Sequence, residues 1–195
     1  RLAANLSMAI GSILKAHMSI EIRIAVVEDA FAACDVLRRS IVECCLLDHR
    51  NEPAILDAWL GNKTPGMVAN WFASTTNFSL VAIDDGVLVG VALLTRGGKV
   101  SLCYLLPEAQ YRGIGLALLT RIEAQAIEWS IRSLQLHSTA TAAAFYARHG
   151  YIRSGQVRSP YGVETTFFWK SLDPDASIDA TRTRFCNCNM GNAGP

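Results

Sequence analysis

The chain has 195 residues, of which 51% are hydrophobic, and its formal net charge is +1. This length suits one domain of moderate size with tails, and the apolar content is that of a folded globular chain. The small net charge gives no support for binding to nucleic acid or to an acidic membrane surface. No apolar run approaches the roughly 18 to 20 residues of a membrane helix, so we expect a soluble protein.

The six cysteines indicate a reducing compartment. Cys44 and Cys45 are adjacent and cannot easily face one partner, and three cysteines lie in apolar helix-like or strand-like segments. These features argue against a secreted disulfide framework, so a cytoplasmic location is predicted. Cys186 and Cys188 have no second pair and no nearby histidine, so no metal site is expected.

Both ends of the chain are predicted to lie outside the folded domain. Residues 1–17 lack the apolar block and cleavage site of a secretory signal. A mitochondrial-type leader and a translation start at Met18 both remain open, and we favour the second. Periodicity is lost from Leu172 onward. We expect a domain over 18–171, an N-terminal extension over 1–17 that is disordered or partly helical, and a flexible tail over 172–195.

The apolar pattern predicts strands and helices in a mixed order. Apolar segments that alternate or are rich in β-branched residues are predicted to be strands: residues 21–27, 79–83, 87–94, 100–106, 132–137, 151–157 and 163–170. Segments with helical spacing and capping residues are predicted to be helices: residues 30–47 with Asp29 as N-cap, 53–60, part of 63–77, 113–130, and 140–149 with Thr139 as N-cap. Asp84-Asp85-Gly86 is a hairpin signal, so residues 79–106 should form an antiparallel meander.

Residues 100–130 have the pattern of a phosphate-binding turn. Pro107 ends a strand, Gly113 and Gly115 punctuate the turn that follows, and a long helix then begins. The free N–H groups and the dipole at a helix N-terminus favour an anion. The third glycine of a Rossmann fingerprint is missing, and no Gly-Lys-Ser/Thr tripeptide of a P-loop occurs. On this pattern alone, a tight turn without a ligand remains an alternative.

The segment Gln110–Gly115, QYRGIG, resembles the R/Q-x-x-G-x-G/A pyrophosphate motif of the GNAT superfamily of acyl-CoA-dependent N-acyltransferases. Residues 104–108 are similar to the apolar run and Pro-Glu with which that family's fourth strand ends. A second block resembles the family's N-x-x-A-x-x-(apolar)-Tyr pattern through Thr139, Ala142, Phe145, Tyr146, Gly150 and Tyr151, with threonine where asparagine is usual. The resemblance covers 18–171 and implies an α/β (α+β) fold with a mixed, mostly antiparallel sheet flanked by helices on both faces.

The resemblance also implies acetyl-CoA as co-substrate. Backbone groups near Leu105 and Leu106 would bind the pantetheine arm between the fourth and fifth strands. The pyrophosphate would lie on backbone amides of the turn, with charge from Arg112. The residues implied in this turn are Gln110, Tyr111, Arg112, Gly113, Ile114, Gly115, Leu116 and Ala117.

The resemblance places Tyr146 where the family has a tyrosine that protonates the leaving thiolate. A phenol is protonated at neutral pH, which suits a general acid. The base is less clear, because the strand before the turn carries no carboxylate. Glu108 is near the turn, and a water chain or the Asp48-His49 pair are the other options.

The acceptor pocket of this family lies across the sheet from the cofactor, which nominates Asp48, His49 and Tyr161, together with Trp59 and Trp71. A carboxylate beside an imidazole could grip an amine or pass a proton, although such residues also satisfy backbone groups at a turn, and the residues alone favour this second role.

The predicted partner is therefore the amine of a small molecule or peptide, without nucleic acid or membrane, and the protein is expected to be a monomer or homodimer. A non-catalytic acyl-CoA-binding module is the alternative function.

Overall fold

The computed structural model describes residues 20–173. The predictions for residues 1–17, for Cys186 and Cys188, and for the tail beyond Asp173 lie outside this range. Within it, the amide of Leu172 still donates to the carbonyl of Arg132 at 2.8 Å. None of the helices in the described part of the chain has the length and apolar character that a membrane span requires.

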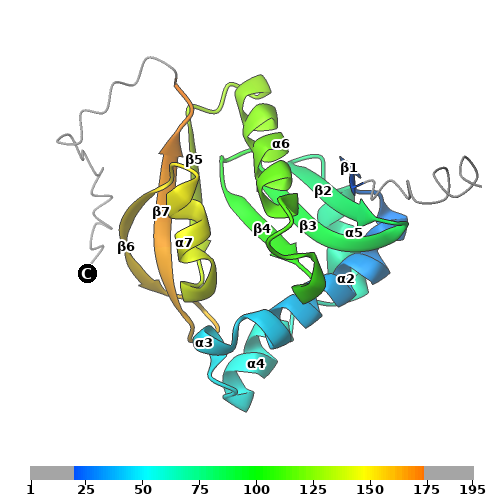
Figure 1. Ribbon diagram of the computed structural model, residues 1–195, viewed down its shortest axis with the longest axis vertical. Helices are drawn as coiled ribbons and strands as arrows, with labels where there is room; N and C mark the ends of the chain where they lie inside the picture. The colour runs from blue at the N-terminus through cyan, green and yellow to red at the C-terminus, as the bar shows by residue number, and fades with distance from the viewer. Residues whose placement is uncertain (1–19, 174–195) are drawn as a thin grey trace, which may run out of the picture.

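The strands form two antiparallel sheets (Figure 1). The first contains β1 (Ile20–Ile24), β2 (Asn77–Asp84), β3 (Val87–Thr95) and β4 (Val100–Leu105) in that order, and the second contains β5 (Ser133–Ser138), β7 (Glu164–Ser171) and β6 (Ile152–Arg158) in that order. A parallel bridge between Lys99 and Gln135 joins them. The predicted mixed, mostly antiparallel architecture is confirmed.

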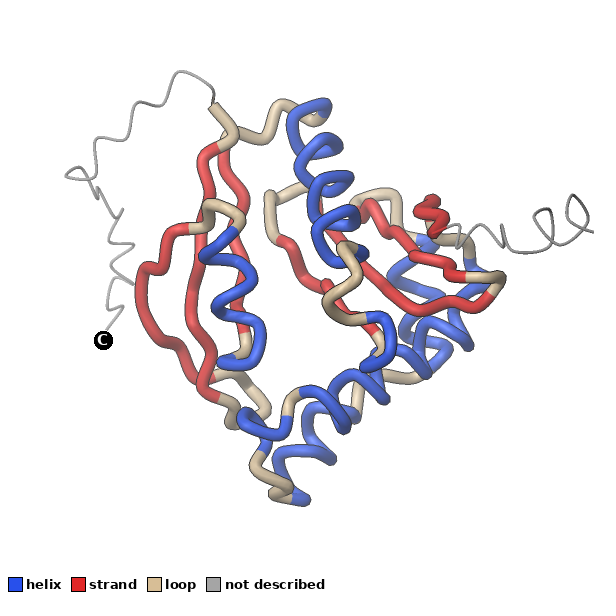
Figure 2. Tube along the Cα trace, in the orientation of Figure 1, coloured by secondary structure: helices blue, strands red, loops and turns tan. Residues whose placement is uncertain are grey.

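Helices cover both faces of the strands, as Figure 2 shows. Helices α2 (Ala30–Arg39) and α5 (Pro65–Ala73) pack on one face of the first sheet, and α6 (Ile114–Glu128) packs on the other. Helix α7 (Ala140–Arg148) packs on the second sheet and contacts α3 (Leu46–His49), which precedes α4 (Pro53–Leu60). Two short 3-10 helices are η1 (Val27–Asp29) and η3 (Pro107–Ala109), and η2 (Ser40–Cys44) is a π-helix that continues α2.

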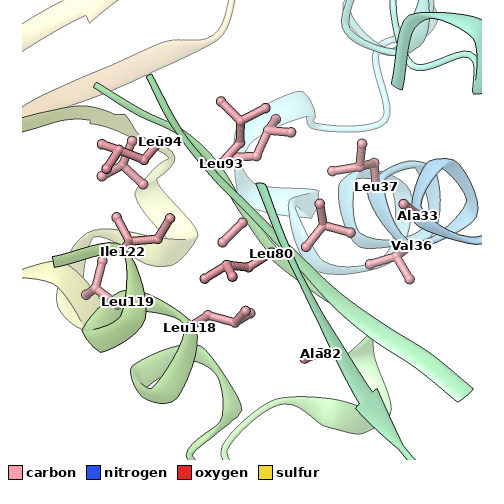
Figure 3. Close-up of a cluster of buried hydrophobic side chains, with 14 of the residues drawn as sticks. Ala33, Val36, Leu37, Leu80, Ala82, Leu93, Leu94, Leu118, Leu119 and Ile122 are labelled. Carbon is pink, nitrogen blue, oxygen red and sulfur yellow. The ribbon is translucent and has the colours of Figure 1, made fainter. Parts of the chain in front are cut away.

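Aliphatic side chains pack on both faces of the first sheet, which lies between α2 and α6 (Figure 3). Leu80 of β2 and Leu94 of β3 are fully buried, Leu37 approaches from α2, and Leu118 and Ile122 approach from α6. Burying a side chain of this size stabilises the fold by about 1.5–3 kcal/mol. This packing holds α6, and with it the turn at its N-terminus, in a fixed position on the sheet.

The backbone angles and a capping hydrogen bond agree with the predicted hairpin and helix ends. Asp85 and Gly86 have φ values of +47° and +80°, as a two-residue hairpin turn requires. Thr139 Oγ1 accepts from the amide of Ala142 at 3.2 Å and caps α7 as predicted. Gly150 follows α7 with a φ of +83°.

Two predictions in the first helical region are right only in part. The helix predicted over 30–47 continues beyond α2 as the π-helix η2 and is interrupted at Cys45, before α3. Asp29 stands at the N-cap position of α2, but its side chain makes no capping hydrogen bond there. The guanidinium of Arg23 instead binds both oxygens of the Asp29 carboxylate, one of which also accepts from the amide of Val26, because this fork matches a carboxylate better than a single amide does.

Candidate functional site

The turn before α6 presents a row of free amides. Gly113 adopts a φ of +81° next to the first residue of the helix, a conformation that favours glycine. The amides of residues 111–116 have no hydrogen-bond acceptor among residues 20–173. The amide of Gln110 donates to the carbonyl of Pro107, and that of Ala117 donates to the carbonyl of Gly113. Of the turn residues 110–117 named from the sequence, the first and the last therefore have no free N–H group. Six adjacent free N–H groups at the start of a 15-residue helix form a site suited to an anion.

Arg112 does not point its charge into this turn. Its guanidinium donates to Oδ2 of Asp84 at the end of β2; the Asp84 side chain is largely buried and that of Arg112 is half-buried. The other oxygen of Asp84 is buried and has no hydrogen-bond partner in the described residues. The predicted role of Arg112 as an added charge for a pyrophosphate is therefore weakened, because the ion pair uses that charge to tie the turn to the sheet.

The edge of β4 that faces β5 is open beyond the Lys99–Gln135 bridge. The β3–β4 register pairs Gly90 with Leu105 and Ala92 with Cys103. The amide of Leu106 donates to Val89, so the alternation of an antiparallel ladder turns the backbone groups of Cys103 and Leu105 away from β3. They can pair with an extended ligand, as the sequence predicted for Leu105.

The same prediction for Leu106 was wrong. Its N–H donates to the carbonyl of Val89 at 2.9 Å, and its C=O accepts from the amide of Ala109 at 3.0 Å. Both groups are used because η3 begins directly after this residue.

Tyr146 lies beside this open edge. It is 6% exposed on α7, and its ring packs against Phe145, Tyr151 and Phe168. Its hydroxyl and the thiol of Cys103 are close enough to affect each other's pKa. Burial raises the pKa of Cys103 to about 11 and raises the pKa of Tyr146 well above its usual value. At neutral pH the phenol therefore keeps its proton and can donate a hydrogen bond to an anion.

A cavity of about 450 Å³ lies on the other side of the strands. Its walls come from α4, α5, β4, the end of β5 and the β6–β7 loop. Trp59 and Tyr161 stack with ring centroids 6.2 Å apart and planes within 5°. Trp71 and Tyr104 complete an aromatic lining. The structure thus brings together Trp59, Trp71 and Tyr161, which the sequence nominated from positions far apart in the chain.

Asp48 and His49 do not line this cavity. The Asp48 carboxylate accepts from the amide of Ala140 at 2.6 Å and from Oγ1 of Thr141 at 2.7 Å, so it binds the N-terminus of α7. His49 is fully buried; its Nδ1 accepts from the amide of Asn51 at 3.0 Å, and its Nε2 lies 3.3 Å from the carbonyl of Val42. These contacts favour a structural role for Asp48 and His49 over a role in substrate binding, because all the partners are local or belong to α7.

Glu108 also has a surface role. Its carboxylate pairs with Arg39 at 3.1 Å, and 57% of its side chain is exposed. A backbone hydrogen bond and the guanidinium of Arg39 lower its pKa, which makes it a weaker base. No aspartate or glutamate among residues 20–173 lines the cavity, so a carboxylate base is not found there.

Lys63 is the functional candidate that sequence reasoning missed. It lines the cavity with only 4% exposure, its Nζ donates to the carbonyl of Trp59 and to Oδ1 of Asn62, and it lies 5.4 Å from the ring centroid of Tyr161. Burial lowers its pKa to about 8. The sequence gives no indication that Lys63 is buried, since a lysine that follows a helix-ending Gly-Asn usually faces water.

A family model described as an acetyltransferase (GNAT) domain matches residues 55–172. Among solved structures, the GCN5-related N-acetyltransferase from Rhodopseudomonas palustris is 24% identical, with a TM-score of 0.69, over 80% of this chain and 99% of that one. The PaiA N-acetyltransferase from Thermoplasma acidophilum, in complex with coenzyme A, is 20% identical with a TM-score of 0.67, over 79% and 99%.

YncA from Salmonella typhimurium, a protein described as a putative acetyltransferase and solved with its cofactor acetyl-CoA, is 20% identical with a TM-score of 0.60, over 83% of this chain and 99% of that one. At these identities the structures show a shared fold. No curated protein matches the chain significantly.

Proposed function

Because the chain belongs to the GNAT acetyltransferase family, we propose that it transfers the acetyl group of acetyl-CoA to a primary amine of a small molecule or peptide, with Tyr146 as the acid at the leaving thiolate. The observation that carries this proposal is that Tyr146, which is buried on α7, lies next to Cys103 at the open edge of β4. The protonated hydroxyl of Tyr146 would lie next to the thioester of an acetyl-CoA molecule bound along β4.

The residues present fit a coenzyme A molecule. The free amides of residues 111–116 would hold its pyrophosphate at the N-terminus of α6. The backbone groups of Cys103 and Leu105 would hold the pantetheine amides like an added strand. This binding directs the sulfur toward the face of β4 on which Cys103 and Tyr146 meet.

The transfer forms a C–N bond, breaks a C–S bond, and moves one proton in total from nitrogen to sulfur. Tyr146 stabilises the sulfur as negative charge develops on it. Because burial raises the pKa of Tyr146 above that of a thiol, the phenol gives its proton to the sulfur only as it regains the proton of the amine through water, so no phenolate accumulates. The amine would approach from the cavity on the opposite face, which Tyr104 of β4 lines.

Substitution of Tyr146 by phenylalanine tests this role. We expect coenzyme A binding to persist and turnover to fall by at least about tenfold, the scale of lost acid catalysis. Turnover is measured as free-thiol release from acetyl-CoA with a panel of amines, and binding by calorimetry. Tyr151→Phe is the matched control, since it removes the hydroxyl of a neighbouring buried tyrosine whose ring centroid lies 5.6 Å away.

Two outcomes would count against the proposal. Unchanged turnover in Tyr146→Phe would remove this residue from the chemistry. Tight binding of coenzyme A without transfer to any amine in the panel would favour the non-catalytic binding module instead.

A further inference from the structure

The cavity on the acceptor side has a positive lining. Lys63 lies buried in it, and the exposed side chains of Lys99 and Arg158 also contribute to its walls. His137 lines it as well, but burial and Lys99 lower its pKa, so it adds no charge at neutral pH. No acidic side chain of the described residues faces them in the lining. A polyamine or another multiply charged cation would meet repulsion here without a compensating carboxylate.

Lys63 has the geometry of an anion ligand. An ammonium has three N–H donors, and two of them are used by the carbonyl of Trp59 and by Oδ1 of Asn62. Within residues 20–173 it has no ion-pair partner. Aromatic rings lie near it at 5.9 Å for Trp71 and 5.4 Å for Tyr161. A buried cation that lacks a counter-ion gains most from a ligand that brings one.

The remaining walls set the size and character of such a ligand. A cavity of about 450 Å³ lined by Trp59, Trp71, Tyr104 and Tyr161 suits a molecule of amino-acid size with an apolar or planar body. The lining extends from Lys63 to Tyr104 of β4 and to Thr139 at the end of β5. One ligand can therefore contact the ammonium and also approach the gap between the two strands.

We propose that the acceptor is an amine that also carries a carboxylate, as an amino acid does, and that Lys63 binds this carboxylate. This inference rests on the proposed acyl transfer and names the substrate class of that reaction. The positive surroundings also favour the neutral form of the acceptor amine, which is the form that attacks a thioester. They thereby lessen the need for a carboxylate base, which the cavity lacks.

The experiment compares amino acids of small, aliphatic and aromatic type with their amides and with the matching amines that lack the carboxylate. Transfer from acetyl-CoA is measured as free-thiol release for the wild type, for Lys63→Met and for Arg132→Met. Arg132 is exposed and does not line the cavity, so its substitution makes the same change in net charge away from the site. Calorimetric binding of the amino acids to the protein saturated with coenzyme A gives a second readout that needs no turnover.

We expect kcat/KM for the best amino acid to exceed that of its amide by at least about tenfold, since an unpaired buried charge costs that much or more. Lys63→Met should remove this preference, so that the amino acid reacts no faster than its amide, and Arg132→Met should keep it. Equal rates for acid and amide in the wild type would overturn the inference but leave acyl transfer standing, and this comparison needs no variant to fold.

The two proposals can also fail separately in the other direction. If no amine is acetylated but amino acids bind the wild type and not Lys63→Met, the carboxylate site stands and the transfer proposal fails. If no amino acid binds or reacts, the inference is wrong whatever the other amines do.

Discussion

Asp48 offers the sharpest test of what the structure changed, because the sequence placed it among the substrate-binding candidates. Asp48 is 8% exposed, and its carboxylate accepts two short hydrogen bonds from the first turn of α7, at 2.6 and 2.7 Å. Hydrogen bonds to a charged group contribute about 1.5–3 kcal/mol each, and an anion at a helix N-terminus adds about 0.3–1 kcal/mol. Because such contributions do not simply add, we expect Asp48→Ala to lower the free energy of unfolding by about 3 kcal/mol.

For a domain of this size that loss corresponds to a fall in Tm of about 6–12 °C. Asp48→Asn keeps one acceptor oxygen and should lose about half as much. Both are measured by thermal unfolding at a fixed coenzyme A concentration, together with KM for the acceptor amine. Asp57→Ala, an exposed aspartate on α4, is the matched control and should change stability by less than about 0.5 kcal/mol.

The structural reading of Asp48 predicts a loss of stability with little change in KM. A variant with unchanged Tm and a strongly raised KM would refute it, and would return Asp48 to the substrate side of the site. A modest fall in kcat is compatible with the reading, since Tyr146 lies on the helix that Asp48 binds.

Three further predictions follow from buried contacts. Gly90→Ala should cost about 1–3 kcal/mol, because a Cβ there would lie 2.6 Å from Cδ2 of Leu105; a denaturation midpoint equal to that of the wild type would contradict this. Arg112→Gln should lower stability by about 1–3 kcal/mol by leaving the Asp84 carboxylate without its ion-pair partner, and adding Asp84→Asn should restore part of it; a large loss of coenzyme A affinity at full stability would instead favour a direct contact of Arg112 with the ligand. The pKa of Lys63 is about 8 in the folded state and 10.5 as the ordinary value, so the unfolded state binds more protons between these values and wild-type stability should rise with pH across this window. The rise, up to about 3 kcal/mol, should appear in urea unfolding as a difference from Lys63→Met that changes between pH 7.5 and 10, and a constant difference would contradict it.

The sequence predicted most elements within a few residues of their ends, because the signals that define them are local. The helix predicted over 53–60 matches α4, and the Asp85-Gly86 turn joins β2 and β3. Proline, glycine and apolar spacing act on neighbouring residues, so they can be read without knowing the fold. The predictions failed where another contact used the group in question: Arg23 binds the Asp29 carboxylate, and Val89 and Ala109 use both backbone groups of Leu106.

Some features of the candidate site could likewise be predicted from the sequence, and others could not. The sequence by itself determined the glycine turn and the tyrosine on α7, because each is marked by a motif within one short segment. Only the tertiary structure decided that Asp48 binds α7, that Cys103 rather than Leu106 offers free backbone groups, and that Lys63 lies buried among aromatic rings. These facts depend on strand register and on packing between segments far apart in the chain, and neither is encoded in local periodicity.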